Sequence, residues 1–291
     1  MKIKETRVEN FLPVNFGQSA WYQHVPFAYW LIENLKPRSF MEMGTHNGIS
    51  YFAFCEAISQ LKIETKCIAI DNWVGDSQAG FFDESVFTNF VENNKKYSNF
   101  SSYIKSDFDK ALVEIEDNSI ELLHIDGFHS YNQVSTDFRL GLEKVDQEKG
   151  IILIHDINEY QITFGVNKFW RELESEYKTM RFNHGHGLGV VMIGNNIDPK
   201  VLEIFDKSNQ NYINNFQDYF EFLGQRYELY AENINLKNTI SDQSKHILAQ
   251  LSEINKLSAS KSDIERDIYR LTNSISWKLT GPLRKLKRIL K

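Results

Sequence analysis

The sequence predicts an α/β fold, an open and mostly parallel sheet flanked by helices, followed by a long C-terminal helix. Three patterns lead to this prediction. Across the first two thirds of the chain, short apolar runs alternate with amphipathic segments of helical period. One of these runs, residues 150–156, is almost continuously apolar, as strands buried on both faces are. From Leu229 onward the apolar period changes to seven, which is typical of a coiled coil.

The composition is compatible with one full α/β domain and an extension. The 291 residues are 42% hydrophobic and 13% aromatic, and the net charge of −6 argues against nucleic acid as the main partner. Cys55 and Cys67 fall in predicted core elements, so we expect buried thiols in a reducing cytoplasm. The N-terminus lacks a signal-like apolar core, and no apolar run approaches the ~18 residues of a membrane-spanning helix. These features predict a cytoplasmic protein.

The elements can be placed in order along the chain. We expect a first helix over residues 21–35, ended by Pro37, after an irregular lead-in. Residues 72–76 are expected to form a loop. Seven strands are predicted over residues 40–44, 67–71, 102–107, 120–126, 150–156, 179–182 and 188–193. Further helices are predicted over residues 50–58, 81–97, 108–115, 131–143 and 166–177.

The turn after the first strand has an unusual glycine pattern. Glu42, Gly44 and Gly48 form Glu-x-Gly-x-x-x-Gly, in which the glycines allow a tight turn and close approach of a ligand. Exposed N–H groups at such a strand-to-helix junction suit a polar or anionic ligand. Asp71, at the end of the second strand, could accept both ribose hydroxyls of a nucleotide-like ligand. A plain structural turn is the alternative.

These residues resemble class I S-adenosylmethionine-dependent methyltransferases, and more closely the bacterial branch that O-methylates sugars beside surface-polysaccharide glycosyltransferases. The resemblance spans residues 21–194. It rests on Glu42-x-Gly44, Asp71, the segment His124–Tyr131, Ile154-His-Asp156 and the segment His184–Gly189. It implies a Rossmann-like seven-stranded methyltransferase sheet with an antiparallel last strand.

The resemblance also implies which residues bind the donor. Ser106 or Asp107 would lie near the adenine, although Asp107 could instead cap the helix that follows. Trp73 would stack on the adenine or only wall the pocket. The full set of predicted cofactor-binding residues is Glu42, Gly44, Thr45, Gly48, Ser50, Asp71, Asn72, Trp73, Ser106, Asp107 and Asp126.

Asp126 and Asp156 follow two adjacent central strands, so their carboxylates should meet at one edge of the sheet. Two carboxylates repel unless a cation or a proton joins them, which argues for a metal. In the related enzymes the first Asp binds magnesium and the His three residues later is the base, a role that falls on His129. His155 stands where relatives can carry an acid. Because magnesium prefers oxygen ligands, a metal held by Asp126, Asp156 and His155 would have fewer protein ligands, or be softer, or be absent.

Four other polar residues lie within the segment that carries the resemblance. His24 is expected to be structural. His184 and His186 would contact the acceptor or form only loop structure. Tyr131 would orient His129 or pack on its own helix.

The heptad repeat predicts self-association. Ile240, Ile247 and Ile254 share one heptad position, and no Pro or Gly occurs between Arg226 and Thr280. Ile at this position and Leu at the other favour a parallel homo-oligomer, most simply a dimer. The alternative is a long helix folded back on the catalytic domain.

Gly281-Pro282 is expected to stop the long helix. The basic, amphipathic tail after it could contact an anionic membrane surface or be simply solvated. The predicted organisation is therefore a methyltransferase domain over residues 1–197, a connecting helical segment over 198–225, a coiled coil over 226–276 and the tail over 277–291.

The function that follows is an S-adenosylmethionine-dependent O-methyltransferase that acts on a sugar hydroxyl of a bacterial surface glycan or its precursor. Its expected partners are that glycan, a second copy of the chain and a glycosyltransferase. The main alternative is a coiled-coil scaffold or chain-length regulator with a degenerate methyltransferase domain. A dinucleotide enzyme is disfavoured, because Gly-x-Gly-x-x-Gly is missing.

Overall fold

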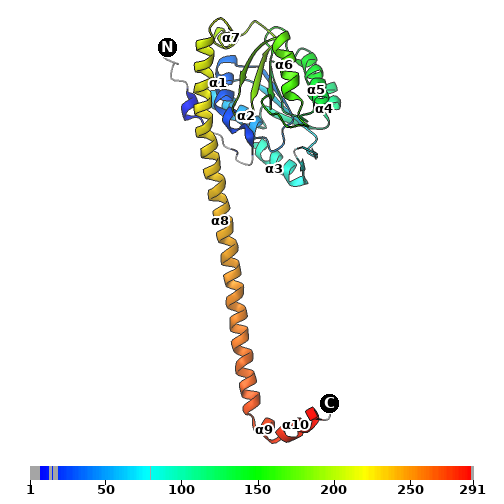
Figure 1. The fold of residues 1–291 in the computed structure, drawn as a ribbon, viewed down its shortest axis with the longest axis vertical. Coiled ribbons are helices and arrows are strands. Elements are labelled where there is room, and N and C mark those ends of the chain that lie inside the picture. Colours follow the sequence, from blue (N-terminus) through cyan, green and yellow to red (C-terminus); the bar gives the residue numbers. More distant parts are fainter. Residues whose placement is uncertain (1–6, 13–14, 16–18, 79, 290–291) are drawn as a thin grey trace. The chain divides into compact units, whose positions relative to one another are not determined.

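A computed structural model of the chain describes residues 7–12, 15, 19–78 and 80–289. Two compact units emerge, residues 1–234 and residues 235–291. The first unit is an α/β domain whose sheet is covered by helices on both faces (Figure 1). Within the described residues, no helix combines the length and the apolar character needed to cross a membrane.

The central sheet has seven strands in the order β5-β2-β1-β6-β7-β9-β8. Neighbouring strands are parallel from β5 to β7, and β9 is antiparallel to both of its neighbours. The predicted Rossmann-like methyltransferase sheet, with seven strands and an antiparallel last strand, is therefore confirmed. The strands are β1 (Ser39–Met43), β2 (Lys66–Asp71), β5 (Ser101–Lys105), β6 (Leu122–Ile125), β7 (Ile151–His155), β8 (Lys178–Phe182) and β9 (Leu188–Met192).

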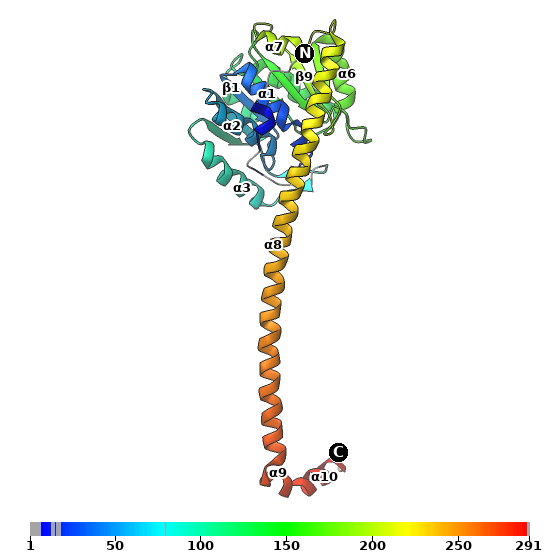
Figure 2. The ribbon, with the colours of Figure 1, turned by 90° about the vertical axis from the view of Figure 1, so that its left-hand side faces the viewer.

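Two apolar cores fill the space between the sheet and its helices. One core joins the sheet to α1 (Val25–Leu35), α2 (Ile49–Leu61) and the first turns of α8 (Gln210–Asn273). The other joins it to α5 (Tyr131–Lys144) and α6 (Val166–Glu176). Helices α1 and α2 of the first core lie side by side in Figure 2. Because β6 and β7 are buried on both faces, almost every residue in them is apolar. The exceptions, His124 and His155, are therefore informative.

Shorter elements surround these cores. The first helix, predicted over residues 21–35, is divided into η2 (Ala20–His24) and α1, and it ends at Leu35, as expected ahead of Pro37. Further short helices of the first unit are η1 (Arg7–Asn10), α3 (Glu84–Asn94), η3 (Lys95–Tyr97), α4 (Phe108–Ala111), η4 (Leu112–Glu114) and α7 (Pro199–Glu203).

One predicted loop contains a small hairpin. Residues expected to be irregular form β3 (Gly75–Asp76), which pairs with β4 (Gly80–Phe81). The helix expected from Phe81 consequently begins only at Glu84, where Asp83 caps it by accepting a hydrogen bond from the backbone N–H of Ser85. The hairpin contributes directly to the pocket described below.

The end of the long helix differs from the prediction. Helix α8 ends at Asn273, eight residues before Gly281, because the Ser274 side chain accepts the N–H of Trp277 and so starts α9 (Ile275–Leu279). Pro282 does not stop a helix. It lies in the first turn of α10 (Gly281–Ile289), where a missing N–H costs nothing.

Candidate functional site

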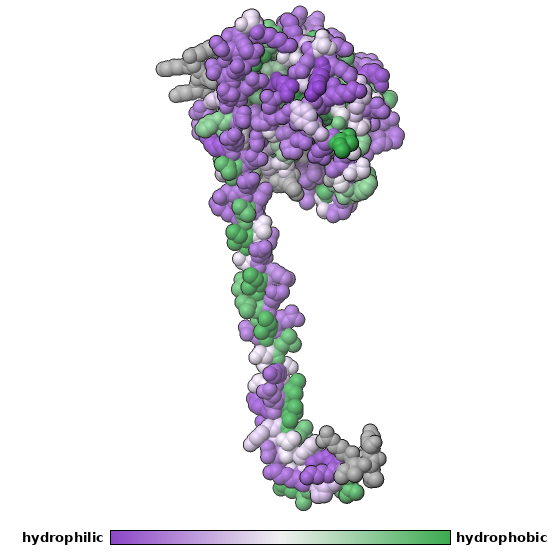
Figure 3. Space-filling view, viewed as in Figure 1, coloured by the Kyte–Doolittle hydropathy of each residue, from purple (hydrophilic) through white to green (hydrophobic). Residues whose placement is uncertain are grey.

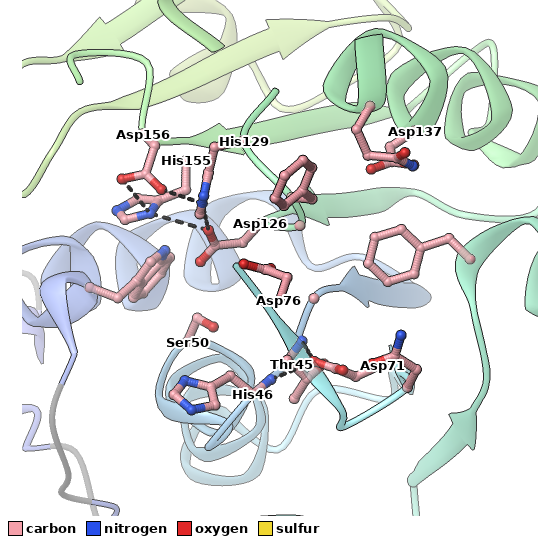
Figure 4. A pocket seen from close by; sticks show the side chains of 18 of the residues that line it. Thr45, His46, Ser50, Asp71, Asp76, Asp126, His129, Asp137, His155 and Asp156 are labelled. Atoms are coloured by element: carbon pink, nitrogen blue, oxygen red, sulfur yellow. Dashed lines mark hydrogen bonds and ion pairs between the residues drawn. The ribbon is translucent and has the colours of Figure 1, made fainter. Parts of the chain in front are cut away.

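A pocket of about 850 Å³ opens at the carboxyl ends of the parallel strands (Figure 4). Open α/β sheets bind ligands at this edge, because the loops that follow the strands converge there. Among the predicted site residues, three lie outside its lining, namely Glu42, Gly48 and Trp73. The others line it: Gly44, Thr45, Ser50, Asp71, Asn72, Ser106, Asp107, Asp126, His129, His155 and Asp156.

Gly44 is needed for the sheet as well as for the pocket. Its φ of +93° suits glycine, and a Cβ atom there would lie 2.1 Å from the carbonyl oxygen of Asp126. The turn therefore holds the end of β1 against the end of β6. Gly48, by contrast, precedes α2 with a φ of +77° and serves the turn itself.

Asp71 ties the first loop to the end of β2. One of its carboxylate oxygens accepts the backbone N–H groups of Thr45 and His46, both at 2.8 Å, and the other accepts that of Trp73 at 2.7 Å. A carboxylate offers about four acceptor positions, so three are occupied. One position remains for a ligand hydroxyl, fewer than the two predicted for Asp71.

Glu42 is completely buried behind the pocket. Its Oε2 lies 2.8 Å from Nδ1 of His124, and the other imidazole nitrogen accepts the indole N–H of Trp21 at 3.3 Å. Burial raises the pKa of Glu42, and the interaction with His124 opposes this effect. The three side chains form a buried polar chain that links β1, β6 and η2.

Trp73 packs in the aromatic core instead of facing the pocket. Only 3% of the residue is exposed, and its ring lies 4.8 Å from that of Phe90. Its indole N–H donates to the carbonyl of His46 at 2.9 Å. Trp73 was predicted either to stack on the adenine or to form a wall of the pocket. Because its ring does not line the pocket, it does neither.

Asp107 lines the pocket with Ser106, and its side chain makes no helix-capping hydrogen bond. Its oxygens accept the ammonium of Lys110 at 2.6 Å and the amide of Asn72 at 3.1 Å. Lys110 first and then Asn72 hold its pKa below the usual value. An ionised carboxylate therefore faces the part of the pocket beyond β2 and β5.

Asp126 and Asp156 converge at the ends of β6 and β7, as the sequence predicts (Figure 4). Asp156 has a φ of +60° and is 6% exposed. Burial raises the pKa of each carboxyl, but His155 and His129 outweigh it and keep both pKa values below the usual range. The pair is thus ionised, and it is stable only because positive charge is close by.

His129 presents an unpaired nitrogen to these carboxylates. Its Nε2 lies 2.7 Å from Oδ2 of Asp156 and 3.8 Å from Oδ1 of Asp126, yet it is buried without a properly directed hydrogen bond. Its ring is stacked on Phe164 at 4.6 Å with an interplanar angle of 3°. Burial lowers the pKa of His129, but the two carboxylates raise it to about 9.

Gln78, on the small hairpin, orients His129, and no motif in the sequence predicts this role. Its carbonyl oxygen accepts the backbone N–H of His129 at 3.0 Å and lies 3.2 Å from Nδ1. The amide nitrogen donates to the carbonyl of Thr163 at 3.1 Å, which fixes the direction of the amide. Nδ1 therefore carries a proton, and Nε2 of the neutral ring is left as a lone pair.

His155 is held in the complementary way. Its Nε2 donates to the carbonyl of Gly185 at 3.0 Å, while its Nδ1 lies 3.4 Å from Oδ1 of Asp126 and 3.5 Å from Oδ1 of Asp156. Burial lowers the pKa of His155, but the two carboxylates raise it above the usual value. A backbone carbonyl behind a histidine that faces carboxylates is typical of metal ligands.

The cluster therefore fits a divalent cation. Ligand atoms of Asp126, His129 and Asp156 all lie within 4.8 Å of one another. Nδ1 of His155 lies 3.4 Å from Oδ1 of Asp126 and 3.5 Å from Oδ1 of Asp156. Two ligand atoms that bind the same cation, each at about 2.1 Å, are separated by a similar distance. A cation at this place would supply the positive charge that protons on the two imidazoles otherwise provide.

The remaining predicted histidines divide between the pocket and the core. His186 lines the pocket, and its Nδ1 lies 3.0 Å from Glu159 and 3.5 Å from Asp156. His184 does not line it, and burial lowers its pKa to about 4. His24 is buried and shares the carbonyl of Gly185 with His155, in agreement with a structural role.

Tyr131 and Asp137 complete the surroundings. Tyr131 donates to Glu172 at 2.7 Å, so it does not orient His129. Asp137 lines the pocket at 1% exposure, with one oxygen bound to Gln133 and the other without a partner. Burial raises its pKa to about 6. Sequence analysis missed it because a single Asp in a helix carries no signal.

Comparison with known proteins relates part of the chain to methyltransferases. A family model described as a methyltransferase domain matches residues 41–157. The chain is 37% identical over 213 residues to the uncharacterised protein y4gI of Sinorhizobium fredii, which covers 72% of this chain and 23% of that protein. It is 29% identical over 152 residues to an uncharacterised protein of Acanthamoeba polyphaga mimivirus, covering 50% of this chain and 65% of that protein.

Among solved structures, the O-methyltransferase TomG from Streptomyces achromogenes, in complex with S-adenosylmethionine, has a TM-score of 0.46 at 12% identity. The match covers 67% of this chain and 93% of that one. The chain spans less than two thirds of the length of each of the two curated relatives. The family match identifies residues 41–157 as a methyltransferase domain.

Proposed function

Starting from this methyltransferase domain, we propose that the chain is an S-adenosylmethionine-dependent O-methyltransferase that modifies a hydroxyl of a neutral sugar, most simply in a bacterial surface glycan or its precursor. One observation carries the proposal. Two ionised aspartates and two histidines with inward-facing nitrogens meet at the floor of a pocket that also reaches the glycine loop after β1. Hydroxyl methylation requires a base and a positive charge at such a place.

The donor would lie over the loop between β1 and α2. Gly44, Thr45 and Ser50 line this side, and the Thr45 hydroxyl is buried without a partner. Asp71 has one acceptor position left for a ribose hydroxyl, and Asp107 faces the space beyond it. A sulfonium is a cation, so an acidic pocket attracts it.

The charge of the lining supports a neutral acceptor. No Lys or Arg occurs among the described residues that line the pocket, whereas seven aspartates do: Asp71, Asp76, Asp107, Asp109, Asp126, Asp137 and Asp156. Phosphate or carboxylate groups on the acceptor would be repelled there. Phe164 offers an apolar surface to a sugar ring, and the aspartates accept hydrogen bonds from its hydroxyls.

The cation and the base are assigned to different histidines. We assign the cation to Asp126, Asp156 and His155, whose ring is 5% exposed and anchored by a backbone carbonyl. His129, at 17% exposure, is the more accessible ring and becomes the general base. The imidazole ligand favours a first-row transition ion such as Mn²⁺ over Mg²⁺. When bound, the cation lowers the pKa of the acceptor hydroxyl.

The transfer itself is an in-line displacement. The acceptor oxygen attacks the methyl carbon, the new O–CH₃ bond forms as the S–CH₃ bond breaks, and the leaving group is the neutral thioether S-adenosylhomocysteine. The hydroxyl proton passes to Nε2 of His129, which must be unprotonated to receive it. With its pKa at about 9, this nitrogen is protonated at pH 7 until another positive charge neutralises the carboxylates. A cation bound by the two carboxylates would leave this nitrogen free to accept the proton.

The experiment combines donor binding, metal content and turnover. Calorimetry should detect S-adenosylhomocysteine binding, and turnover with neutral glycosides should exceed that with matched uronic acids. His129→Ala should keep the metal and lose turnover, whereas His155→Ala should lose both. No binding of the donor product would disprove the methyltransferase proposal. Loss of metal from His129→Ala alone would reverse the two assignments.

A further inference from the structure

The C-terminal unit carries an apolar stripe that nothing in the chain covers along its described length. Eight Ile and Leu residues on α8 are between 54% and 63% exposed, and Figure 3 shows apolar side chains recurring along this helix. A single helix of this length needs a partner to bury such a stripe. The eight residues are Leu236, Ile240, Ile247, Ile254, Leu257, Ile264, Ile268 and Leu271.

We propose that this stripe is the interface with a second copy of the same chain, and that the two α8 helices form a parallel, in-register, two-stranded coiled coil from Leu236 to Leu271. The stripe occupies both core positions of a heptad repeat. One position, called position a, holds Ile240, Ile247, Ile254, Lys261 and Ile268. The other, position d, holds Leu236, Gln243, Gln250, Leu257, Ile264 and Leu271.

The polar residues of the stripe favour parallel over antiparallel pairing. In a parallel, in-register pair each core residue meets its own copy, so Gln243 and Gln250 pair with glutamines and every Ile or Leu meets an apolar side chain. Each of the two antiparallel registers that overlap the stripe most completely puts an isoleucine opposite a glutamine, Ile254 against Gln250 in one and Ile268 against Gln243 in the other. Such a pair buries an amide without a hydrogen-bond partner.

Lys261 is the one charged residue at a core position of the stripe, and an acidic side chain of the same helix lies beside it. Its ammonium lies 3.8 Å from the carboxylate of Glu265, one turn further along the same helix. Because lysine can bury its stem and keep its charged end in water, the two copies of Lys261 can point outward beside this acid. This position weakens the pair but disfavours larger assemblies with a more enclosed core.

The charges beside the stripe agree with the same arrangement. In a parallel pair, the residue before each position a faces the residue five places later on the partner. The resulting pairs along the stripe join His246 to Leu251, Glu253 to Ser258 and Asp267 to Thr272, so no two like charges meet. In an antiparallel pair, one of the two overlapping registers would place Glu253 against its own copy.

The mass of the full chain tests the association. At micromolar concentration, light scattering should give about twice the chain mass of 34.1 kDa. Ile254→Lys should return the protein to the monomer mass. Leu248→Lys is the matched control, because Leu248 is 67% exposed on the same helix outside the stripe. It should remain a dimer. A monomeric wild type, a trimer, or an unchanged Ile254→Lys would overturn the proposal.

A single cysteine tests the direction of the two helices. The native Cys55 and Cys67 are buried, so Ile268→Cys adds one accessible thiol. In the parallel pair the two new thiols are adjacent, and mild oxidation should yield a disulfide-linked dimer. In antiparallel pairs each would lie tens of ångströms from its copy, at ~1.5 Å per residue along the helix. A dimer that resists this cross-link would refute the parallel arrangement.

Discussion

Replacing Gln78 with Leu tests how the reactive nitrogen of His129 is presented. In the native protein the Gln78 oxygen accepts two hydrogen bonds, from the backbone N–H and from Nδ1 of His129. Leucine has a similar volume but accepts neither. The ring can then place its proton on Nε2, toward the Asp156 carboxylate at 2.7 Å. That tautomer removes the lone pair that the proposed base requires.

The expected magnitude follows from these contacts. Leaving a partly buried donor unpaired costs about 1–3 kcal/mol. Because the Gln78 side chain is only half-buried, water can replace part of the loss, so we take about 1–2 kcal/mol. At about 1.4 kcal/mol per tenfold change, kcat/KM should fall roughly 5- to 30-fold. Gln78→Glu keeps an acceptor at the same place and should retain most activity.

The assay pairs kinetics with a direct view of the ring. Nitrogen NMR of histidine-labelled, metal-free protein at pH 10, above the pKa of about 9, distinguishes the two tautomers. His129→Gln identifies the signal. Gln60→Leu, which removes a surface glutamine bound to Glu56, is the matched control. If Gln78→Leu keeps both the native tautomer and full kcat/KM, the reasoning is wrong. A changed tautomer without any methyl transfer would instead refute the proposed function alone.

Three further predictions concern stability. Gly44→Ala should lower the free energy of unfolding by several kcal/mol, because its Cβ would lie 2.1 Å from the Asp126 carbonyl, whereas Gly80→Ala has open space and should cost far less in urea melts. The melting temperature of the metal-free protein should fall as pH rises from about 6.5 to 9, because the raised pKa of His129 contributes stability only while the ring is protonated, and His129→Gln should flatten this slope. Asp137→Asn should stabilise the protein by roughly 1–2 kcal/mol at pH 8 and not at pH 4, since its raised pKa of about 6 makes the buried charge costly only at higher pH, and equal effects at both pH values would contradict this.

The order of strands and helices could be predicted from the sequence, because apolar periodicity is a local property. The seven strands, the antiparallel β9 and the long helix all agree with their expected segments. Boundaries were less accurate where a side chain outside the periodic pattern decided them. Ser274 ends α8 by capping the next helix, and the small hairpin β3–β4 replaces part of a predicted loop and helix.

The approach of Asp126 and Asp156 to one another was also predictable, since parallel strands bring their carboxyl ends to one edge. What these residues contact was not. Trp73 and Glu42 carried the expected sequence signals, yet one packs in an aromatic core and the other pairs with His124. Whether a polar side chain lines a cavity depends on neighbours distant in sequence, which no local pattern records.

The sequence by itself determined the kind of protein: an α/β sheet with a glycine turn, two aspartates at its carboxyl edge and a heptad-patterned helix. Only the tertiary structure decided which atoms face one another. Gln78 and His129 are 51 residues apart, and their contact depends on the hairpin meeting the loop after β6. Periodicity is set by each segment's own need to bury apolar surface, whereas the protonation and direction of a catalytic ring are set by partners that only the folded chain brings together.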